Sequence, residues 1–369
     1  MKNTFGTSVT LTLFGESHGP GVGAVLDGLA PGLPVEDESI RRQLARRRPV
    51  TGLETPRQEP DEYQLLSGVF QGRTTGTPLA LFIPNRQAES GEYCYGPARP
   101  GHADYAASRK YHGFEDYRGG GHFSGRVTAA LAAAGGILLP ALKRAGITVG
   151  THILACGGAR DRAFQDPEAE LAALEAADFP VLDAAAGEAI QREMQAARAA
   201  GDSVGGIIQT AVCGLPAGLG EPWFDSLEGL LAHALFSLGG VKGVEFGAGF
   251  GFAALRGSAA NDPLRLAEGA VVTASNHNGG IDGGITNAMP VVFQCAVKPT
   301  PSIGLPQQTV DFVAMEETEL TVHGRHDPSI LRRICPAADG VTALVLADLL
   351  AQRYGTDALA KGTAAWNTD

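Results

Sequence analysis

The sequence predicts a globular protein of mixed α and β structure, an α+β chain, on three observations. Of its 369 residues, 44% are hydrophobic and 19% are charged, as in proteins that bury a core in water. Several short stretches alternate apolar and polar residues, which is the period of a half-buried strand. Other stretches are longer, rich in alanine and leucine, and apolar at helical spacing. The length fits one large domain or two ordinary ones.

Strands are expected first near the N-terminus. Residues 9–14 alternate in polarity, and 21–29 form a second apolar stretch. Further strands are expected at 64–69 and 79–83. Between the two pairs, Asp37 is expected to cap an amphipathic helix that runs into the arginines 46–48. Arginines that end a helix complement its dipole, which explains one or two of them without a ligand.

Helices are expected later in the chain. Residues 127–143 predict a buried helix that ends at Gly146, and 160–200 predict a peripheral helical pair without chemistry. Residues 341–349 lie in a final structural helix. The stretches 21–34 and 206–220 resemble each other, which reflects either an internal duplication or chance in a glycine-rich chain. A duplication would pack the halves as one pseudo-symmetric unit.

Charge and composition argue against several classes of protein. A net charge of −11 argues against general affinity for nucleic acid. The first 19 residues are too polar for a signal peptide, and no apolar run reaches the length of a membrane span. Five cysteines without a CxxC pair fit reduced thiols and argue against a structural zinc site. We therefore expect a cytoplasmic protein with no metal.

The segment from Arg99 to Arg126 is the most unusual stretch. It holds His102 and His122 in glycine-bounded loops among several cations, and residues 119–121 are three consecutive glycines. Glycines in a row are expected where backbone passes close to something such as a ligand, and the cations suggest an anion. Ser124 precedes a helix start, which is a natural phosphate site. The alternative is a solvated basic turn.

Other loops have similar composition. His18 follows a strand on a glycine-flanked loop, where it meets either a ligand or water. Residues 275–284 are too glycine-rich for a core, and 298–302 join a cation to hydroxyls in a rigid turn; both suit phosphate or ring contacts. Residues 324–328 bring arginine, histidine and aspartate together, although Asp before Pro is often only a turn former.

In combination these motifs resemble the chorismate synthase family over roughly residues 6–350, although no single motif carries the match. In chain order they are FGESHG, RRRP, EPD at 59–61, SGVFQGRTTGTP, RPGHADY, DYRGGG, GLPAGLGEP, VKGVEFG, SNHNGG, KPTPSI and GRHDP. The resemblance implies a lyase that converts 5-enolpyruvylshikimate 3-phosphate into chorismate with reduced FMN and without net redox change. It also implies a homotetramer and a single-domain β-α-β sandwich of antiparallel sheets flanked by helices, covering residues 1–369.

The resemblance assigns roles to individual residues. His18 would protonate the reduced flavin or hold its charge, His102 would sit on the departing phosphate as imidazolium, and Asp327 would act as a base. Arg47 matches an arginine of the family attributed to NADP or substrate binding. The implied FMN contacts are His122, Phe123, Ser124, Gly283, Lys298, Pro299, Thr300, Pro301, Ser302 and Arg325.

Some positions depart from the family pattern and leave questions open. His122 and Phe123 replace a cation and a serine, and Gly239 and Gly240 stand where relatives carry asparagine and alanine. Without GxGxxG after a strand, flavin reduction from outside is favoured over reduction by NADPH on this chain. Two rivals remain: a relative that binds flavin or shikimate phosphates without turnover, and a metal-dependent phosphohydrolase, which no metal-ligand spacing supports.

Overall fold

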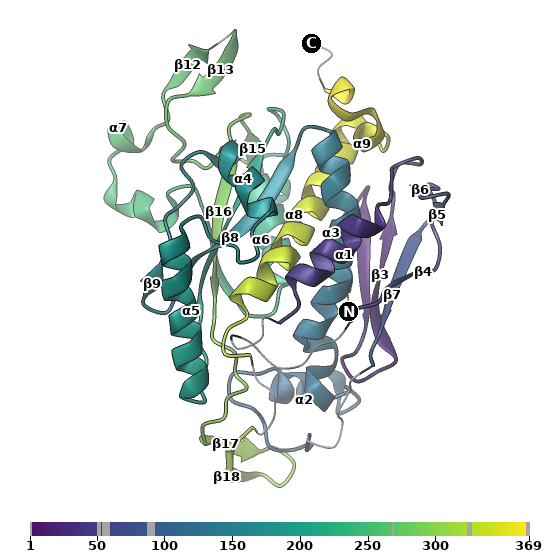
Figure 1. Ribbon diagram of the computed structural model, residues 1–369, viewed down its shortest axis with the longest axis vertical. Coiled ribbons are helices and arrows are strands. Elements are labelled where there is room, and N and C mark those ends of the chain that lie inside the picture. Colours follow the sequence, from purple (N-terminus) through teal and green to yellow (C-terminus); the bar gives the residue numbers. More distant parts are fainter. Residues whose placement is uncertain are drawn as a thin grey trace.

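Two antiparallel sheets enclose a layer of helices in the computed structural model of the chain (Figure 1). The structure describes residues 2–49, 53, 60–86, 93–267, 269–322 and 327–366. The first sheet has the strand order β1-β2-β3-β7-β4, and the second has the order β11-β16-β10-β8-β9. The expected α+β class with antiparallel sheets is confirmed, and its largest helices lie between the sheets.

The elements have the following bounds. The first sheet contains β1 (Thr4–Phe5), β2 (Thr10–Gly15), β3 (Gly21–Asp27), β7 (Leu79–Pro84) and β4 (Gln64–Leu65). The second contains β11 (Val241–Phe246), β16 (Val291–Val297), β10 (Gly206–Cys213), β8 (Thr148–Cys156) and β9 (Ala159–Arg160). Four hairpins complete the strands: β5 (Val69–Phe70) with β6 (Arg73–Thr74), β12 (Leu264–Ala267) with β13 (Ala270–Thr273), β14 (Ile281–Asp282) with β15 (Ile285–Thr286), and β17 (Gln307–Asp311) with β18 (Glu316–Leu320).

The α-helices are α1 (Asp37–Arg46), α2 (Asp104–Tyr111), α3 (Thr128–Arg144), α4 (Pro167–Glu175), α5 (Ala184–Ala199), α6 (Leu227–Phe236), α7 (Gly257–Ala260), α8 (Leu331–Tyr354) and α9 (Ala358–Lys361). Short 3₁₀ turns are η2 (Arg118–Phe123), η3 (Gly125–Val127), η4 (Trp223–Asp225), η5 (Gly249–Ala254) and η6 (Gly362–Ala365).

Helices α3 and α8 form the centre of the molecule (Figure 1). Helix α3 contacts β3 and β7 on one side and β8 on the other, while α8 contacts β8, β10 and β2. The two helices cross so closely that a Cβ on Gly135 would lie 3.0 Å from the Cα of Gly340. Both segments are long and apolar enough to cross a membrane, but 72% and 100% of their apolar windows are buried inside the protein. They are therefore core helices, packed between the two sheets.

Both faces of the second sheet are covered by helices, and alternate residues of β8 contact the two sides. Thr151 points inward, where its hydroxyl donates to the buried carboxylate of Asp339 on α8 at 2.6 Å. The next residue, His152, points outward to the side that α4 covers, where it lies 3.3 Å from Asp161. Helices α4 and α5 thus cover the outer face, as expected for residues 160–200.

The two halves of the chain repeat one arrangement. The similar stretches each start with the central strand of a sheet, β3 or β10, and continue into a matching turn. In the first turn, Thr74 Oγ1 accepts the N–H of Leu33 and donates to the carbonyl of Ala30, at 2.9 and 2.6 Å. In the second, Thr286 Oγ1 makes the same two bonds to Leu219 and Pro216, at 2.8 and 2.7 Å. This correspondence favours duplication over chance.

Two local expectations were wrong. Asp37 is the first residue of α1, and Glu36 occupies the cap position without a side-chain cap bond within the described part of the chain. Asp37 instead accepts hydrogen bonds from Arg41 and Tyr63, which compete with capping. Residues 64–69 do not form one strand, because only Gln64–Leu65 pairs with β7 while Val69 belongs to a separate hairpin.

Candidate active site

The glycine triplet lies between two catalytic candidates. A Cβ on Gly119 would lie 2.2 Å from Cε1 of His18, and a Cβ on Gly120 would lie 3.2 Å from Nε2 of His102. Both glycines have positive φ, +60° and +96°, which side chains rarely adopt. The backbone therefore passes close to two imidazoles, and this close approach explains why the triplet is glycine.

His18 is held on the loop between β2 and β3. Its Nδ1 lies 3.2 Å from the hydroxyl of Ser17, which also donates to the carbonyl of Arg118 at 3.2 Å. The ring packs edge-on against Tyr93 with centroids 5.2 Å apart. The strand fixes the position of the loop, and the aromatic contact fixes the ring, so His18 has a defined orientation.

His102 is ordered by an aspartate and an arginine. Its Nδ1 lies 2.6 Å from Oδ1 of Asp104 and 3.1 Å from Nη2 of Arg99. Arg99 also donates from Nε and Nη2 to the two carboxylate oxygens of Asp104, at 2.8 and 2.7 Å. Burial opposes ionisation of Asp104, but the hydrogen bonds from Arg99 and His102 outweigh it and hold the pKa of this carboxyl well below its ordinary value.

Residues 122–124 have partners inside the chain. His122 Nδ1 lies 2.8 Å from the carbonyl oxygen of Gly15 and so ties η2 to the end of β2. Phe123 is 45% exposed and packs edge-on against Tyr111. Ser124 Oγ accepts the N–H of Arg126 at 3.2 Å, so this amide is not open to the phosphate that we expected at the helix start.

The turn 298–302 joins two other motifs to the site. Lys298 Nζ donates to the carbonyl of Gly101, next to His102, at 2.5 Å. Thr300 Oγ1 donates to the carbonyl of Asp327 at 2.8 Å. The carboxylate of Asp327 forms an ion pair with Arg333, a residue that sequence reasoning did not single out. Arg325 lies outside the described residues.

Arg47 is buried, with 3% of its surface exposed. Its Nη2 donates to the carbonyl of Gly125 and to the hydroxyl of Thr128, at 3.0 and 2.9 Å. Its Nε has no hydrogen-bond partner among the described residues. Burial, reinforced by the charge of Arg333, lowers the pKa of Arg47 to about 9. Asp61, 3.7 Å away, offsets part of this lowering, and a further anion beside the guanidinium would relieve the rest.

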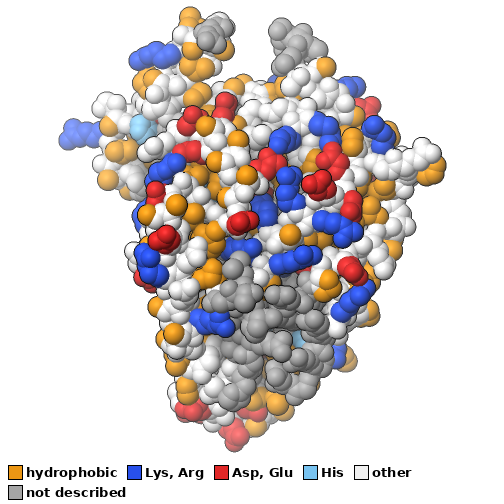
Figure 2. All heavy atoms as spheres, in the orientation of Figure 1, with side chains coloured by type: hydrophobic (Ala, Val, Ile, Leu, Met, Phe, Trp, Pro, Cys, Tyr) orange, Lys and Arg blue, Asp and Glu red, His pale blue; other side chains and the backbone are white. Residues whose placement is uncertain are grey.

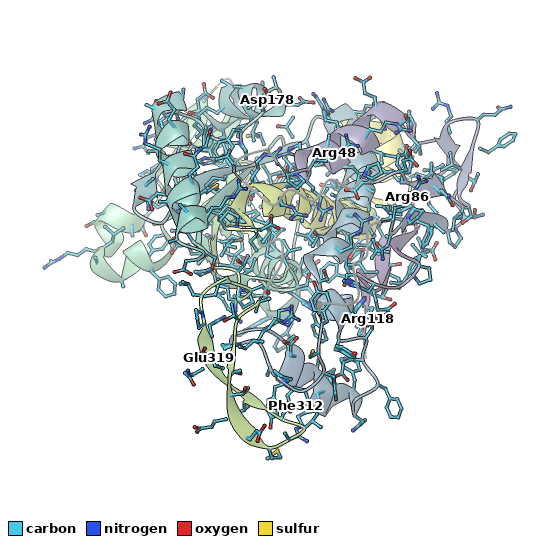
Figure 3. All side chains as sticks on the ribbon, turned by 60° about the horizontal axis from the view of Figure 1, so that its bottom comes forward. Arg48, Arg86, Arg118, Asp178, Phe312 and Glu319 are labelled. Carbon is cyan, nitrogen blue, oxygen red and sulfur yellow. The ribbon has the colours of Figure 1, made fainter. Side chains whose placement is uncertain are left out.

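A cavity of about 290 Å³ adjoins His102. Aromatic rings line much of it, namely Tyr93, Tyr95, Tyr117, Phe123 and Phe312. Phe312 lies at the end of the β17–β18 hairpin, which packs against α2 (Figure 3). Cys94, Glu115 and Asp116 also line the cavity, and Asp116 pairs with Arg118 at 2.7 Å. A flat, apolar ligand with a charged edge fits such a lining.

Gly283 is not brought together with the other residues. It lies in the β14–β15 turn, before the start of β16, whereas Lys298 follows the end of that strand. The seven residues of β16 rise about 3.3 Å each, so the two ends of this strand lie roughly 20 Å apart. Figure 1 accordingly shows β15 and α2 at opposite ends of the molecule.

The charged side chains on one face of the molecule are mixed in sign. In Figure 2, Lys and Arg side chains are interspersed with Asp and Glu over the middle of the face shown, and no single sign covers the described part of it. The described residues contain no group of three His, Cys, Asp or Glu side chains placed to hold a metal ion.

Sequence reasoning missed the partners of the catalytic candidates. Asp104 stands two residues after His102, and that short spacing was the available signal. Asp61 pairs with both Arg47, at 3.7 Å, and Arg126, although 65 residues separate it from Arg126. Such a pairing leaves no local pattern, because it depends on how α1 and η3 pack.

The fold and site define an enzyme of the β-α-β sandwich class, with two imidazoles set against a glycine triplet and one of them, His102, lining an aromatic cavity. A family model described as chorismate synthase matches residues 9–351. The chain is 47% identical to a chorismate synthase of Thermococcus kodakarensis, over 96% of this chain and 99% of that protein. It is 45% identical to one of Aeropyrum pernix, over 95% and 93%. A crystal structure of chorismate synthase superimposes with a TM-score of 0.78 at 28% identity, covering 98% of both chains. The chain belongs to the chorismate synthase family.

Proposed function

We propose that this chain is a chorismate synthase. It is a lyase that eliminates phosphate from 5-enolpyruvylshikimate 3-phosphate to form chorismate, the last step of the shikimate pathway and a source of aromatic amino acids. The observation that carries the proposal is the pair of imidazoles set against Gly119 and Gly120, of which His102 lines the aromatic cavity together with Gly120. Family membership extends over nearly the whole chain.

The family uses reduced FMN, and the residues present fit this group. The cavity next to His102 is lined by flat rings. Lys298 donates to the carbonyl of Gly101, the residue before His102. We assign Phe123, Ser124 and the turn 298–302 to flavin contacts, with Arg325 as a further contact outside the described residues. His122, tied to Gly15, acts by holding this loop in place. The chemistry that bound reduced FMN would supply is reversible electron donation to the allylic phosphate ester, with no net reductant consumed.

Three side chains are assigned to proton transfer. His102 holds a proton at Nε2, the nitrogen that faces Gly120, and delivers it to the departing phosphate. His18, ordered by Ser17 and Tyr93, is the proton-holding group on the other side of the glycine triplet. Asp327, fixed by Arg333, is the base. His18 and His102 lie against the consecutive residues Gly119 and Gly120. This closeness supports action of both imidazoles on one bound flavin and one bound substrate.

Arg47 is proposed to face a phosphate or carboxylate. Its unpartnered Nε and its lowered pKa support an anion beside it. Its other contacts, to Gly125 and Thr128, show that it also holds η3 and α3 against α1. Removal of Arg47 is therefore expected to weaken substrate binding and stability together.

Gly283 can belong to the same flavin site as Lys298 only if it comes from another copy of the chain. The distance along β16 supports this arrangement and the homotetramer expected from the resemblance. Apolar side chains near that end are almost fully exposed, including Trp223 at 86%, Phe224 at 92% and Leu266 at 82%. Sedimentation of the purified protein tests this proposal, and a monomer would contradict it.

Two further proposals concern the source of reduced flavin and the cellular compartment. We propose that reduced flavin is supplied from outside, with NADPH as a possible source only through a separate reductase, because no dinucleotide fingerprint is present in the sequence. The cysteines described by the structure are all free, which supports action in the reducing cytoplasm.

An anaerobic assay tests the function. Purified protein, 5-enolpyruvylshikimate 3-phosphate and chemically reduced FMN are mixed, and chorismate and phosphate are followed together. We expect equal amounts of both products, insensitivity to chelators, and a loss of about 100-fold or more in His102→Ala, since a positioned acid contributes that much. Flavin binding without products would favour the binding-only relative. Phosphate without chorismate, abolished by a chelator, would favour a phosphohydrolase.

A further inference from the structure

Asp104 makes the closest polar contact to His102. The distance from Oδ1 to Nδ1 is 2.6 Å, and all three side chains of the Arg99–Asp104–His102 cluster are largely buried, at 11%, 15% and 16% exposure. Asp104 also accepts the backbone N–H of Arg99 at 3.0 Å. With three bonds from Arg99 alone, the carboxylate cannot turn away from the imidazole.

The charge of this carboxylate decides which nitrogen of His102 carries a proton. An ionised carboxylate only accepts hydrogen bonds, so at 2.6 Å the Nδ1 of His102 must be the donor. The alternative, Nδ1 accepting from Arg99 Nη2 at 3.1 Å, would place a ring lone pair against the carboxylate oxygen. The shorter contact prevails. Nε2 is then the nitrogen left to face Gly120 and the cavity.

Other charged groups lie farther from the ring. Lys298 is bonded to the carbonyl of Gly101 and approaches from the end of β16. Glu115 and Asp116 line the same cavity, and Asp116 is engaged by Arg118. Among the described charged side chains, only Arg99 and Asp104 have a contact with the imidazole of His102 that reaches hydrogen-bond distance.

We propose that Asp104 is a positioning residue for His102: it fixes the ring and keeps a proton on Nδ1, so that Nε2 is the nitrogen that donates to the leaving phosphate. The proposal rests on the proposed function of His102. In the step, the Nε2–H bond breaks and an O–H bond forms on the departing phosphate. The imidazolium becomes neutral imidazole and retains its Nδ1 proton against Asp104. Arg99 keeps Asp104 ionised, so the carboxylate does not take that proton.

A purely structural role for Asp104 predicts something different. Asp104 is the first residue of α2, where a carboxylate also complements the helix dipole. In that case its loss would weaken α2 without changing the tautomer of His102. The tautomer of His102 therefore separates the two roles.

The test is ¹⁵N NMR of histidine-labelled protein at a pH where His102 is neutral, with assignment by His102→Gln. In the wild type we expect the His102 proton on Nδ1. In Asp104→Asn, the amide donates to Nδ1, and we expect the proton to move to Nε2. In the lyase assay the same variant is expected to lose about 100-fold or more in kcat, with KM nearly unchanged, as when a triad aspartate is replaced by asparagine.

The matched control is Asp116→Asn, which breaks a similar arginine–aspartate pair in the same cavity. It is expected to leave the His102 tautomer unchanged. A wild-type His102 with its proton on Nε2 would overturn the proposal, and so would an Asp104→Asn protein with the wild-type tautomer and kcat. Because the wild-type spectrum needs no turnover, a failed lyase assay would contradict the proposed function and leave the positioning claim to be decided by the tautomer.

Discussion

Replacing Gly119 by alanine is expected to abolish most activity with a small loss of stability. The added Cβ would lie 2.2 Å from Cε1 of His18 and 2.4 Å from its Nδ1. Since carbon atoms in contact sit about 3.5 Å apart, the ring must move by roughly 1.3 Å. A shift of this size disturbs the contacts of the ring with Ser17 and Tyr93. A misplacement of about 1 Å costs about 100-fold in rate.

The stability cost is estimated separately. An alanine at φ +60° pays about 1–2 kcal/mol for the left-handed backbone conformation. The clash itself adds little, because a side chain and not backbone has to move. Gly72→Ala is the matched control: its φ is +72°, and no described atom lies within 4 Å of its Cβ position. It carries similar backbone strain without touching a histidine.

Two measurements decide the outcome. Chorismate formation is followed anaerobically, and the free energy of unfolding is measured in urea. We expect Gly119→Ala to lose about 100-fold in kcat while Gly72→Ala keeps the wild-type value, with similar stability losses in both. Wild-type turnover by Gly119→Ala would refute the reasoning that His18 is fixed by this close approach. Equal losses of activity in both variants would assign the effect to backbone strain.

Three further predictions follow. Thr74→Val and Thr286→Val each leave one buried N–H and one carbonyl without a hydrogen-bond partner. Each substitution should lower the free energy of unfolding by about 1–3 kcal/mol per unpaired group. Unequal losses in denaturant titrations would argue against equivalent turns. Burial works against ionisation of Asp161, but hydrogen bonds from His152 and from backbone amides outweigh it and lower the pKa of Asp161. The stabilisation from this carboxylate should therefore be present above about pH 4 and be lost as the pH falls further. In Asp161→Asn, the free energy of unfolding should fall less steeply with decreasing pH. Cys94 is exposed in the cavity, whereas burial raises the pKa of Cys295 to about 12. A thiol reagent should therefore label one cysteine rapidly, bound flavin should slow this labelling, and Cys94→Ser should abolish it. Rapid labelling that flavin leaves unchanged would count against the cavity as the flavin site.

Local periodicity was enough to predict much of the secondary structure. The alternation at 9–14 became β2, the apolar run 79–83 became β7, and the apolar stretch 127–143 became α3. These elements follow from which residues are apolar at a spacing of two or near four, a property of neighbours in the chain. The expected strand at 64–69 failed because Gly68, at φ +80°, turns the chain away from β7. Val69 then pairs with Thr74 of β6 instead.

The sequence by itself also singled out the loops that we propose to carry chemistry. His18, His102 and the glycine triplet stood out because glycine-bounded histidines serve no core. What the glycines approach was decided only by tertiary structure: Gly119 and Gly120 press against two imidazoles, one of them more than 100 residues away in the chain. Likewise only the fold separates Gly283 from Lys298, by the length of β16. Residue type and period are local properties, whereas the meeting of loops depends on strand register and helix packing, which act between distant segments.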